Sequence, residues 1–356
     1  MQDIEDIRKK IDELDIKIME LLNKRAEQAL KIKKTSAGQA PIRPERESDV
    51  VRKLVKANKG PVPDNALRQI FTQIIASFRD EMQLDKPVSV SYLGPAGTYS
   101  EEAAIKLFGN TIELRPEQTV LGVIRAVEGG SVNIAVLPIE NSSEGPVIET
   151  HRLLQRTGTR IIAEVTLPVI HCLLSKSADL DEIKTVYAHP QALGQCRNWL
   201  ATHLPKARQM PCASNSAAAE LAAKKENTAA IAGKKAGQIY GLEVLQAGIN
   251  DQPGNETRFI ALGNLDTQPT GSDKTSVIIV LNDKPGALYE VLGILADAGI
   301  SMTRLESRPY GKGQYAFYID FAGHFKDAKI AEALDKVDKN TRVCHVLGSY
   351  PMEVSR

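Results

Sequence analysis

LPIENSSEG, residues 137–145, is the stretch on which the fold of the middle of the chain depends. It follows an apolar, β-branched run at 132–136 that suits a buried strand, and it precedes VIETHRLLQR (147–156), which has the spacing of an amphipathic helix. The polar cluster is therefore predicted to lie on a strand-to-helix turn. Ligands of open α/β sheets bind on such turns. The stretch is thus either part of a small-molecule site or an ordinary solvated turn punctuated by Gly145 and Pro146.

Length and composition are typical of a multidomain globular protein. A chain of 356 residues is long enough for two or three domains, and its 42% hydrophobic and 25% charged residues are ordinary values. The net charge of +1 gives no reason to expect nucleic acid or an anionic membrane as a partner. No apolar run approaches about 20 residues, and the N-terminus MQDIEDIRKK lacks the apolar core of a secretory signal. We therefore expect a cytoplasmic protein with no membrane partner.

The cysteines and histidines predict neither a disulfide scaffold nor a metal site. The four cysteines, Cys172, Cys196, Cys212 and Cys344, show no C-x-x-C spacing, and the six histidines form no H-E-x-x-H cluster. We expect buried free thiols and no bound metal.

The N-terminal segment is predicted to be helical. A heptad pattern of apolar residues over 4–32 indicates one long helix with a narrow apolar seam. The seam is interrupted by Arg25, which should meet an anion or a carboxylate, or else extend out of the seam. Two more helices are predicted at 45–57 and 65–82. Three helices of this shape bury little surface within one chain, which favours pairing with a second copy.

From residue 87 the chain alternates between strands and helices, which is typical of a mostly parallel α/β sheet. GPAGTYS (94–100) is a glycine-rich turn, but it has neither the GxGxxG spacing nor the lysine of a nucleotide-binding loop. A second α/β unit starts near residue 165, and a late strand at 259–262, preceded by Thr257, is expected to return to the first unit. The predicted architecture is two lobes with a ligand between them.

Polar residues of the second unit allow a structural as well as a functional interpretation. Ser214 and Ser216 are suited to cap a helix, and Gln191 and Gln195 lie four residues apart on one helix face. After a polar linker at 267–274, the remaining chain has the βαββαβ order of a ferredoxin-like unit.

Six motifs in order resemble one family. GPAGTYS, LPIENSSEG, HPQALGQC (189–196) and NETRFIALG (255–263) resemble the signatures of prephenate dehydratases, and PGAL (285–288) and ESRP (306–309) resemble the phenylalanine-binding signature of ACT domains. Over nearly its whole length the chain is similar to the bifunctional chorismate mutase/prephenate dehydratases. The resemblance implies a helical mutase-type dimerisation domain (1–86), a two-lobed α/β dehydratase domain like periplasmic binding proteins (87–266, second lobe about 166–244) and a ferredoxin-like ACT domain (274–356).

The resemblance also implies a reaction and its residues. Prephenate loses its ring carboxylate and its C4 hydroxyl to give phenylpyruvate, without a cofactor. Thr257 maps to the catalytic threonine of the family, and Asn141 and Gln195 map to active-site amides. Because the segment has no basic cluster, neutral donors and helix N-termini are expected to hold the carboxylates. Further prephenate contacts are expected from Thr98, Ser100, Glu140, Ser142, His171, Gln191, Ser214, Asn215, Arg258 and Phe259.

For chorismate, the clamp residues of the family map to Arg8, Arg25, Arg46 and Glu47. Arg8 and Arg25 lie 17 residues apart, about 25 Å along a helix that rises ~1.5 Å per residue, so they cannot hold one small substrate within a single straight helix. A homodimer or higher oligomer with shared sites, as in the family, resolves this.

Three departures from the family pattern predict a weakened or unusually built mutase site with dimerisation retained. Ser36, Phe78 and Met82 stand where the family has polar or charged groups. Losing a donor to the breaking ether oxygen removes an interaction that stabilises the transition state.

In the ACT domain, the resemblance implies feedback inhibition by L-phenylalanine bound at a dimer interface. Its expected contacts are Asn282, Gly286, Ala287, Leu288, Glu306, Ser307, Arg308 and Pro309. Two alternatives remain open. One is a monofunctional dehydratase whose N-terminal helices only dimerise, and the other is a non-catalytic amino-acid sensor. Of the sensors, a secreted receptor would need a signal sequence, and a DNA-binding regulator would need a basic recognition helix. We find neither feature in the N-terminal segment.

Overall fold

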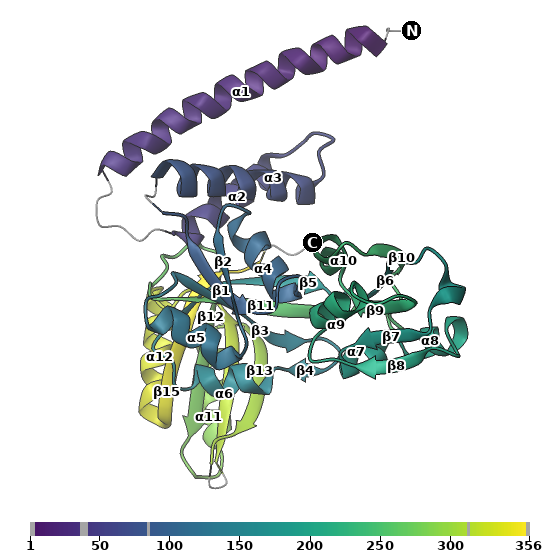
Figure 1. Cartoon of the computed structure of the whole chain (residues 1–356). Helices are drawn as coiled ribbons and strands as arrows, with labels where there is room; N and C mark the ends of the chain where they lie inside the picture. Colours follow the sequence, from purple (N-terminus) through teal and green to yellow (C-terminus); the bar gives the residue numbers. More distant parts are fainter. Residues whose placement is uncertain (1–3, 36–41, 84–85, 312–313, 354–356) are drawn as a thin grey trace.

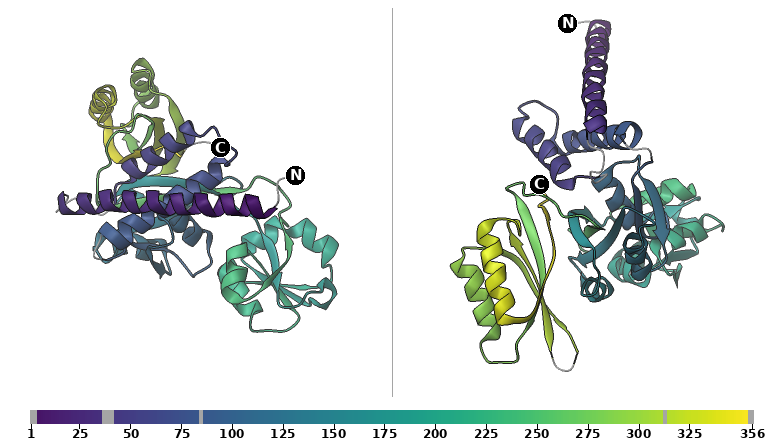
Figure 2. Two further views of the ribbon diagram at one scale, coloured as in Figure 1. Left: turned by 90° about the horizontal axis from the view of Figure 1, so that it is seen from above. Right: turned by 90° about the vertical axis from the view of Figure 1, so that its left-hand side faces the viewer.

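The computed structural model describes residues 4–35, 42–83, 86–311 and 314–353. Figure 1 shows a helical N-terminal part and two α/β lobes side by side, and the right-hand view of Figure 2 shows the C-terminal sheet beside the first lobe. This agrees with the predicted fold class of a helical segment, a two-lobed α/β unit and a ferredoxin-like domain.

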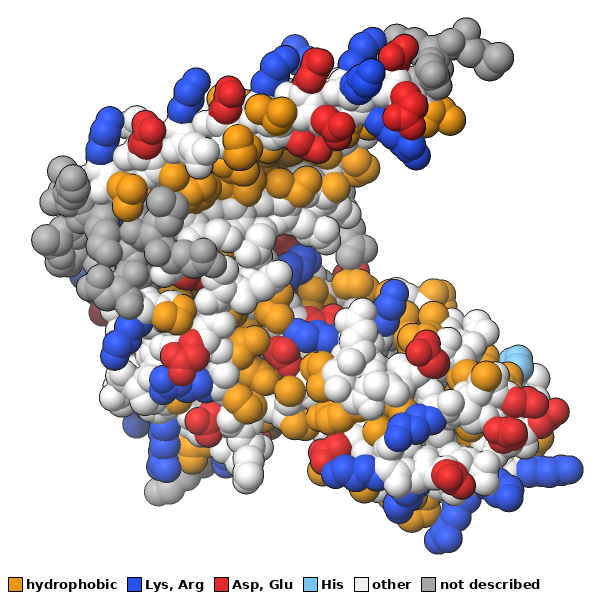
Figure 3. All heavy atoms as spheres, turned by 45° about the horizontal axis from the view of Figure 1, so that its top comes forward, with side chains coloured by type: hydrophobic (Ala, Val, Ile, Leu, Met, Phe, Trp, Pro, Cys, Tyr) orange, Lys and Arg blue, Asp and Glu red, His pale blue; other side chains and the backbone are white. Residues whose placement is uncertain are grey.

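The N-terminal helices are α1 (Ile4–Thr35), α2 (Pro44–Ala57) and α3 (Asp64–Ser77), and α3 continues as a short π-helix, η1 (Phe78–Gln83). The third helix was expected to run to residue 82 as one α-helix; its last turns are wider. Helix α1 projects along the top of the molecule, and its apolar side chains form a visible stripe (Figure 3). The seam residues Ile4, Ile7, Ile11, Leu14, Ile18 and Leu21 are 44–66% exposed. Between Ile4 and Leu21 the seam therefore has no partner among the described residues of the chain.

The first lobe is built on a mixed sheet with the order β2-β1-β3-β11-β5, in which β4 pairs with β3. Its strands are β1 (Ser89–Leu93), β2 (Glu113–Glu117), β3 (Ile134–Asn141), β4 (Gly145–Pro146), β5 (Arg160–Pro168) and β11 (Glu256–Gly263). Its helices are α4 (Tyr99–Phe108), α5 (Val120–Glu128) and α6 (Ile148–Leu154). β1 runs parallel to β2 and β3, whereas β11 is antiparallel to both of its neighbours. The expected return of the late strand to the first unit is confirmed.

The second lobe has the sheet order β10-β6-β9-β7-β8. Its strands are β6 (Cys172–Ser175), β7 (Thr185–Ala188), β8 (Arg208–Pro211), β9 (Thr228–Ala232) and β10 (Glu243–Ala247). Its helices are η2 (Leu180–Glu182), α7 (Pro190–Gln195), α8 (Arg197–His203), α9 (Asn215–Ala222) and α10 (Lys234–Tyr240). Residues 166–168, expected at the start of this lobe, end β5 of the first sheet instead.

The C-terminal part is a four-stranded antiparallel sheet, β13-β14-β12-β15, with two helices on one face. Its elements are β12 (Asp273–Leu281), α11 (Ala287–Asp297), β13 (Met302–Pro309), β14 (Tyr315–Ala322), α12 (Ala328–Asn340) and β15 (Thr341–Pro351). This is the predicted βαββαβ order. The other face shares a hydrophobic core with the first lobe, through residues such as Ile278 and Tyr318 on one side and Leu137 and Ile260 on the other.

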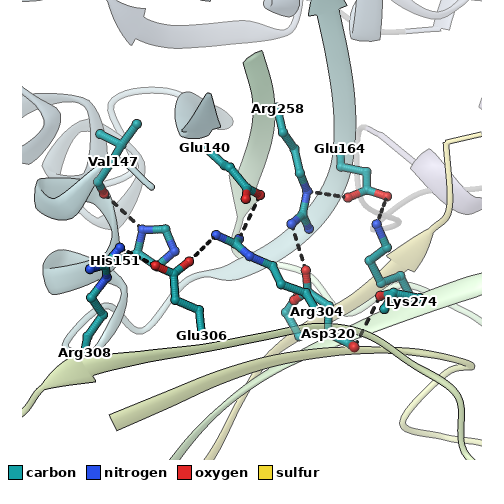
Figure 4. Close-up of polar contacts among 12 residues, drawn as sticks. Glu140, Val147, His151, Glu164, Arg258, Lys274, Arg304, Glu306, Arg308 and Asp320 are labelled. Carbon is teal, nitrogen blue, oxygen red and sulfur yellow. Dashed lines mark hydrogen bonds and ion pairs between the residues drawn. The ribbon is translucent and has the colours of Figure 1, made fainter. Parts of the chain in front are cut away.

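A buried ionic network crosses this shared interface (Figure 4). Arg258 on β11 lies 2.8 Å from a Glu164 carboxylate oxygen on β5 and 2.7 Å from Asp320 on β14, and it donates to the Tyr350 hydroxyl at 2.9 Å. Lys274 meets the other oxygen of Glu164 at 2.6 Å. Burial alone would raise the pKa of Asp320, but Arg258 and the other donors outweigh burial and hold that pKa below its ordinary value. The network joins five strands of two sheets, β5 and β11 of the first lobe and β12, β14 and β15 of the C-terminal sheet.

Arg258→Gln is expected to destabilise the chain by about 3–5 kcal/mol, because it removes the paired cation from the buried Asp320 and one of the two cations that contact Glu164. Thermal or denaturant unfolding measures this. The pKa of Asp320 is lowered in the folded state, so the native stabilisation is present above the carboxyl's unfolded pKa and is lost as pH falls through the folded value. The difference between variant and parent should therefore shrink on acidification. The matched control is Arg115→Gln, whose pair with Glu113 is about half exposed and should change stability by less than about 1 kcal/mol. Equal effects of the two substitutions would contradict the assignment.

Candidate active site

The candidate site is a cavity of about 440 Å³ between the two lobes. It lies beside the two segments in which the chain crosses from one lobe to the other, 169–171 and 248–255. These segments are hydrogen-bonded to one another: Val169 donates from its backbone to the Asn255 carbonyl at 2.7 Å, and the Asn250 side chain donates to the Val169 carbonyl at 3.0 Å. The cavity is lined by Tyr99, Pro138, Asn141, Glu144, Gly145, Pro146, Val147, Val169, His171, His189, Gln191, Ala192, Gln195, Asn215, Asn255 and Thr257.

The opening stretch of the sequence supplies one wall of this cavity. Strand β3 runs through Asn141, so the first half of LPIENSSEG is strand rather than turn, and only residues 142–144 turn before β4. The prediction of a turn over the whole polar cluster was therefore wrong. The side-chain oxygen of Asn141 (Oδ1) accepts from the backbone amides of Ser143 at 3.0 Å and Glu144 at 3.1 Å. Because backbone N–H groups only donate, these contacts fix which way the Asn141 amide points.

Strand pairing places the threonine beside this amide. Thr257 on β11 stands opposite Asn141 on β3 in the antiparallel ladder. The Asn141 side-chain nitrogen donates to the Thr257 hydroxyl oxygen at 2.9 Å. The hydroxyl is thereby an acceptor toward Asn141, and its own proton is left for another partner.

The opposite wall comes from the second lobe. Gln195, at the end of α7, lies with its side-chain oxygen 2.9 Å from the His171 Nε2 atom, and its side-chain nitrogen donates to Glu144 at 3.3 Å. Burial lowers the pKa of His171, although the Gln195 contact opposes this shift. His171 is therefore neutral at physiological pH, and it donates from Nε2 to the Gln195 oxygen.

Several cavity residues were not predicted from the sequence, among them Asn255, Glu144 and His189. Asn255 is 93% buried, and its side chain contacts both walls, accepting from Asn141 at 2.7 Å and donating to Gln195 at 3.2 Å. All three stand within the motifs already singled out, so motif membership was the available signal. What the sequence could not indicate was which side of each turn the side chain occupies.

Six of the predicted prephenate contacts meet in this cavity: Thr257, Asn141, Gln195, His171, Gln191 and Asn215. The others lie outside its lining. Ser142 accepts from the backbone of Glu256 at 2.9 Å, and Ser214 caps α9 through the Ala217 backbone at 3.0 Å.

Three predicted contacts of the central strands face elsewhere. Glu140 lies on the side of the sheet that packs against the C-terminal domain, where it pairs with Arg304 at 3.3 Å. Arg258 belongs to the ionic network of the same interface, and Phe259 is 2% exposed in the core beneath α4. Strand alternation explains the positions of Glu140 and Arg258, because each directly neighbours Asn141 or Thr257 and points to the opposite face. Phe259, two residues beyond Thr257, lies farther along the same face, under α4.

GPAGTYS contributes Tyr99 to the cavity lining, but the hydroxyls of Thr98 and Ser100 lie outside it, and the motif joins the two lobes. Thr98 donates to the carbonyl of Leu93 at 3.1 Å, and Ser100 is buried in the first turn of α4. The Ala96 carbonyl accepts from Ser216 of the second lobe. Gly97 has φ +82°, and a Cβ there would lie 3.1 Å from the backbone of Ala236. Glycine is required here both by conformation and by the close approach of α10.

The predicted chorismate residues do not converge within one chain. Arg8 pairs with Glu5 at 3.0 Å and Arg46 with Asp49 at 3.8 Å, both on exposed helix surfaces. The guanidinium of Arg25 lies 4.7 Å from the centre of the Phe78 ring, a cation–π contact. Burial lowers the pKa of Arg25.

Glu47 faces inward from α2 and is held by Arg79, which donates to both of its carboxylate oxygens at 3.0 Å. Burial, the largest cause, raises the pKa of Glu47 although Arg79 opposes it. Glu47 also lines a larger hollow of about 1120 Å³ between the helices, α4 and β5, which contains none of the catalytic candidates. Ser36 and the side chain of Met82 lie outside the described residues.

The predicted phenylalanine motifs share one end of the C-terminal sheet. β12 and β13 both run antiparallel to β14, so the loop after β12 and the residues Glu306–Pro309 lie at the same end. Gly286, with φ +81°, is the N-cap of α11. The Asn282 side chain donates to the carbonyl of Asn340 at 3.0 Å.

Within the described residues, no cluster of three or more histidine, cysteine or carboxylate side chains is arranged to bind a metal. Among the helices described, none is long and apolar enough to cross a membrane. The four cysteines are free thiols; Cys172 and Cys196 are buried as expected, whereas Cys212 and Cys344 are only partly buried.

The fold and this cavity define a two-lobed α/β small-molecule domain, joined to a helical segment and to an ACT-type sheet. Comparison with known families assigns each part: Chorismate mutase type II matches residues 7–83, Prephenate dehydratase 90–267 and the ACT domain 275–339. The chain belongs to the bifunctional chorismate mutase/prephenate dehydratase family.

Individual relatives agree with this assignment. The chain is 40% identical over 358 residues to the bifunctional chorismate mutase/prephenate dehydratase of Pseudomonas aeruginosa, covering 98% of this chain and 97% of that one. It is similar to the structure of prephenate dehydratase in complex with L-Phe from Arthrobacter aurescens, with 35% identity, a TM-score of 0.69, and coverage of 74% of this chain and 90% of that one. A structure described as GqqA, a novel type of quorum quenching acylase, matches with 31% identity, a TM-score of 0.68, and coverage of 74% and 98%.

Proposed function

We propose that this chain converts chorismate to prephenate in its N-terminal part and prephenate to phenylpyruvate in the cleft, for phenylalanine biosynthesis, and that L-phenylalanine inhibits the second step through the ACT domain. The observation that supports the dehydratase assignment is the hydrogen bond from Asn141 to the Thr257 hydroxyl inside an inter-lobe cavity. The similarity of the whole chain to bifunctional relatives supports the pairing of activities.

The dehydratase step needs little more than placement and a proton. When the ring carboxylate leaves as CO2, its bonding electrons enter the ring and expel the C4 hydroxyl, which departs as water after gaining a proton. Aromatisation drives the reaction, so the protein supplies orientation and a donor at the leaving oxygen. Thr257 is placed to donate this proton, because its lone pair is engaged by the Asn141 amide and its own O–H is not. Solvent then restores the proton to the threonine.

A hydroxyl is a weak acid, and the donor to it matters for that reason. A hydrogen bond accepted from Asn141 polarises the Thr257 O–H bond and stabilises negative charge that develops on the oxygen during proton donation. The cavity lining is rich in amides, from Asn141, Gln191, Gln195, Asn215 and Asn255. Neutral donors of this kind bind carboxylates without the desolvation cost of a buried cation.

Acyl transfer is the competing chemistry suggested by the structure described as an acylase. An acyl-transfer nucleophile needs a general base within hydrogen-bond reach. The hydrogen bond to the Thr257 hydroxyl comes from an amide, which is not a base, and the neutral His171 is engaged with Gln195. The cleft therefore favours the dehydratase.

Thr257→Ala is expected to lower prephenate turnover (kcat) by about 10²- to 10⁴-fold, the range for losing a positioned proton donor. Thr257→Ser keeps the hydroxyl and should retain most of the activity. Phenylpyruvate formation, followed by absorbance, measures both variants, and thermal unfolding verifies that each is folded. A folded Thr257→Ala variant with near-normal turnover would disprove the role of the threonine.

For the mutase, we propose a homodimer in which α1 pairs with a second copy through its exposed seam. The seam is apolar and exposed from Ile4 to Leu21, and Arg8 and Arg25 are too far apart on one helix to clamp a single chorismate. Pairing buries the seam and allows arginines from two chains to form one site. The Phe78 ring occupies the face of Arg25 where the family has a polar group, which supports a weakened mutase.

Separate assays of chorismate and prephenate consumption by the purified chain test this proposal. We expect slow chorismate turnover beside normal prephenate turnover, and a faster mutase in Phe78→Ser, because the ring leaves the guanidinium and a hydroxyl donor replaces it. Prephenate turnover of the same variant is the control. Chorismate turnover typical of a dedicated mutase in the parent chain would contradict the weakened site. If neither the parent chain nor Phe78→Ser turned over chorismate at all, the result would favour a helical domain that only dimerises.

For regulation, we propose that phenylalanine acts through strand β13. Its residues alternate between the faces of the ACT sheet: Ser307 pairs with Phe317, which packs toward the helices, whereas Glu306 pairs with Tyr318, which packs on the first lobe. On the lobe side, Arg304 bridges Glu306 at 2.6 Å and Glu140 at 3.3 Å (Figure 4). Glu140 directly precedes Asn141. A ligand that shifts β13 therefore pulls on the strand that carries the catalytic amide.

Arg304→Gln is expected to raise the phenylalanine concentration for half-inhibition by about 5- to 150-fold, the range of ordinary allosteric coupling, with basal prephenate turnover within about twofold of the parent. Calorimetry without substrate should still detect phenylalanine binding, because no expected ligand contact is removed. Lys336→Gln, which breaks an exposed pair with Glu332 on α12, is the matched control and should leave inhibition unchanged. Unaltered inhibition in Arg304→Gln would exclude this route.

A further inference from the structure

Three amide side chains of the cleft, those of Asn141, Asn255 and Gln195, form a ring of hydrogen bonds with Glu144, and all the bonds run in one direction. The Asn141 nitrogen donates to Asn255 at 2.7 Å, the Asn255 nitrogen donates to Gln195 at 3.2 Å, and the Gln195 nitrogen donates to Glu144 at 3.3 Å. The ring closes because the backbone amide of Glu144 donates to the Asn141 oxygen at 3.1 Å. Each amide side chain thus donates a hydrogen bond through its nitrogen and accepts one through its oxygen.

The direction of this ring is set at a single place and transmitted from there. The backbone amides of Ser143 and Glu144 require the oxygen of Asn141 to face them, so its nitrogen faces Asn255 and Thr257. Asn255 must then present oxygen to Asn141, which leaves its nitrogen for Gln195. Asn255 is the step at which orientation passes from the wall formed by the first lobe to the wall formed by the second.

We propose that Asn255 is a positioning residue of the dehydratase reaction, an inference that rests on the proposed role of the cleft. It acts through its neighbours: it helps to hold the Asn141 amide against the Thr257 hydroxyl, and it turns the Gln195 oxygen toward His171 and the Gln195 nitrogen toward the cavity rim. Asn255 also ties the lobes together, because Asn141 and Gln195 belong to different sheets. Its backbone carbonyl accepts from Val169 in the other crossing segment, so the residue itself is anchored.

No other side chain of this size performs both functions. Aspartate accepts from Asn141 but, when ionised, opposes its negative oxygen to the Gln195 oxygen. Leucine has a similar shape and neither donates nor accepts. The site is 93% buried, so water is poorly placed to substitute for the missing group. When its carboxyl is protonated, however, aspartate regains a donor and resembles the native amide.

Asn255→Asp therefore gives a test that a purely structural role does not satisfy. In the full-length protein, prephenate kcat should fall about 10- to 100-fold at about pH 8, and the ratio of variant to parent kcat should rise at least about fivefold toward about pH 5, as the introduced carboxyl gains its proton. Glu144, His171 and His189 line the same cavity in both proteins, so the ratio removes their common contribution. Asn255→Leu should show a low kcat and a flat ratio.

The matched control is Asn264→Asp, which removes a similar donation, to the Val127 carbonyl at 3.0 Å, away from the cavity. It should leave kcat near that of the parent at every pH. The proposal is overturned if the Asn255→Asp ratio is flat, or if only KM rises, since that is the signature of repulsion between a carboxylate and an anionic substrate. Should Asn255→Asp fail to fold, Asn255→Ser replaces it: its single hydroxyl can donate or accept, and its kcat must lie between those of the parent and Asn255→Leu.

Thr257→Ala measured in the same assay separates the two proposals. An inactive Thr257→Ala beside an Asn255→Asp variant that behaves like Asn264→Asp overturns the positioning role alone. A fully active Thr257→Ala overturns the assignment of the cleft itself.

Discussion

The pairing of β11 with β3 is the constraint on which the rest of the structure depends. An antiparallel strand that returns from late in the sequence is inserted between β3 and β5, and its register sets Thr257 opposite Asn141 and Arg258 opposite Glu140. Because successive side chains of a strand point to opposite faces, one register assigns Thr257 and Asn141 to the cleft and Arg258 and Glu140 to the ACT interface. A slip by one residue would exchange the two sets. The buried ionic partners of Arg258, which lie on β5 and β14, oppose such a slip.

In this arrangement the central sheet lies between the proposed catalytic cleft and the ACT domain. The ACT sheet packs on one face through a common hydrophobic core, and the cavity lies at the edge where β3 ends and β11 begins. On the proposed route, a signal between the phenylalanine site and the cleft does not pass through the second lobe. It passes through two adjacent positions, Glu140 and Asn141, by the ion pair between Arg304 and Glu140 and then one peptide unit. Strand β3 is hydrogen-bonded to β1 on one side and β11 on the other, so a displacement of Glu140 is passed directly to Asn141.

The sequence predicted the order of elements well, because periodicity and turn residues are local properties. The βαββαβ unit, the long N-terminal helix and the return of the Thr257 strand all followed from pattern. The site was predicted in part: motif membership found Thr257, Asn141, Gln195 and His171, but it also admitted Glu140, Arg258 and Phe259. Those three were assigned to the site in error, because a sequence motif does not show which face of a strand, or which position along that face, each residue occupies. Asn255 was missed for the opposite reason, since an asparagine just before a strand is usually read as a turn residue.

The mixture of charge and neutrality across the molecule has a physical logic. Ionic groups gather where two rigid sheets meet, as in the network around Arg258, because there every charge has a fixed partner and stays buried. The cleft instead uses amides, which can bind an anionic substrate and release a less charged product without leaving an unpaired charge behind. Amides have one disadvantage, which is that their two ends are nearly the same shape and can reverse. The ring that begins at the backbone of residues 143 and 144 and passes through Asn255 removes this freedom, so the lining of the cleft is oriented before substrate arrives.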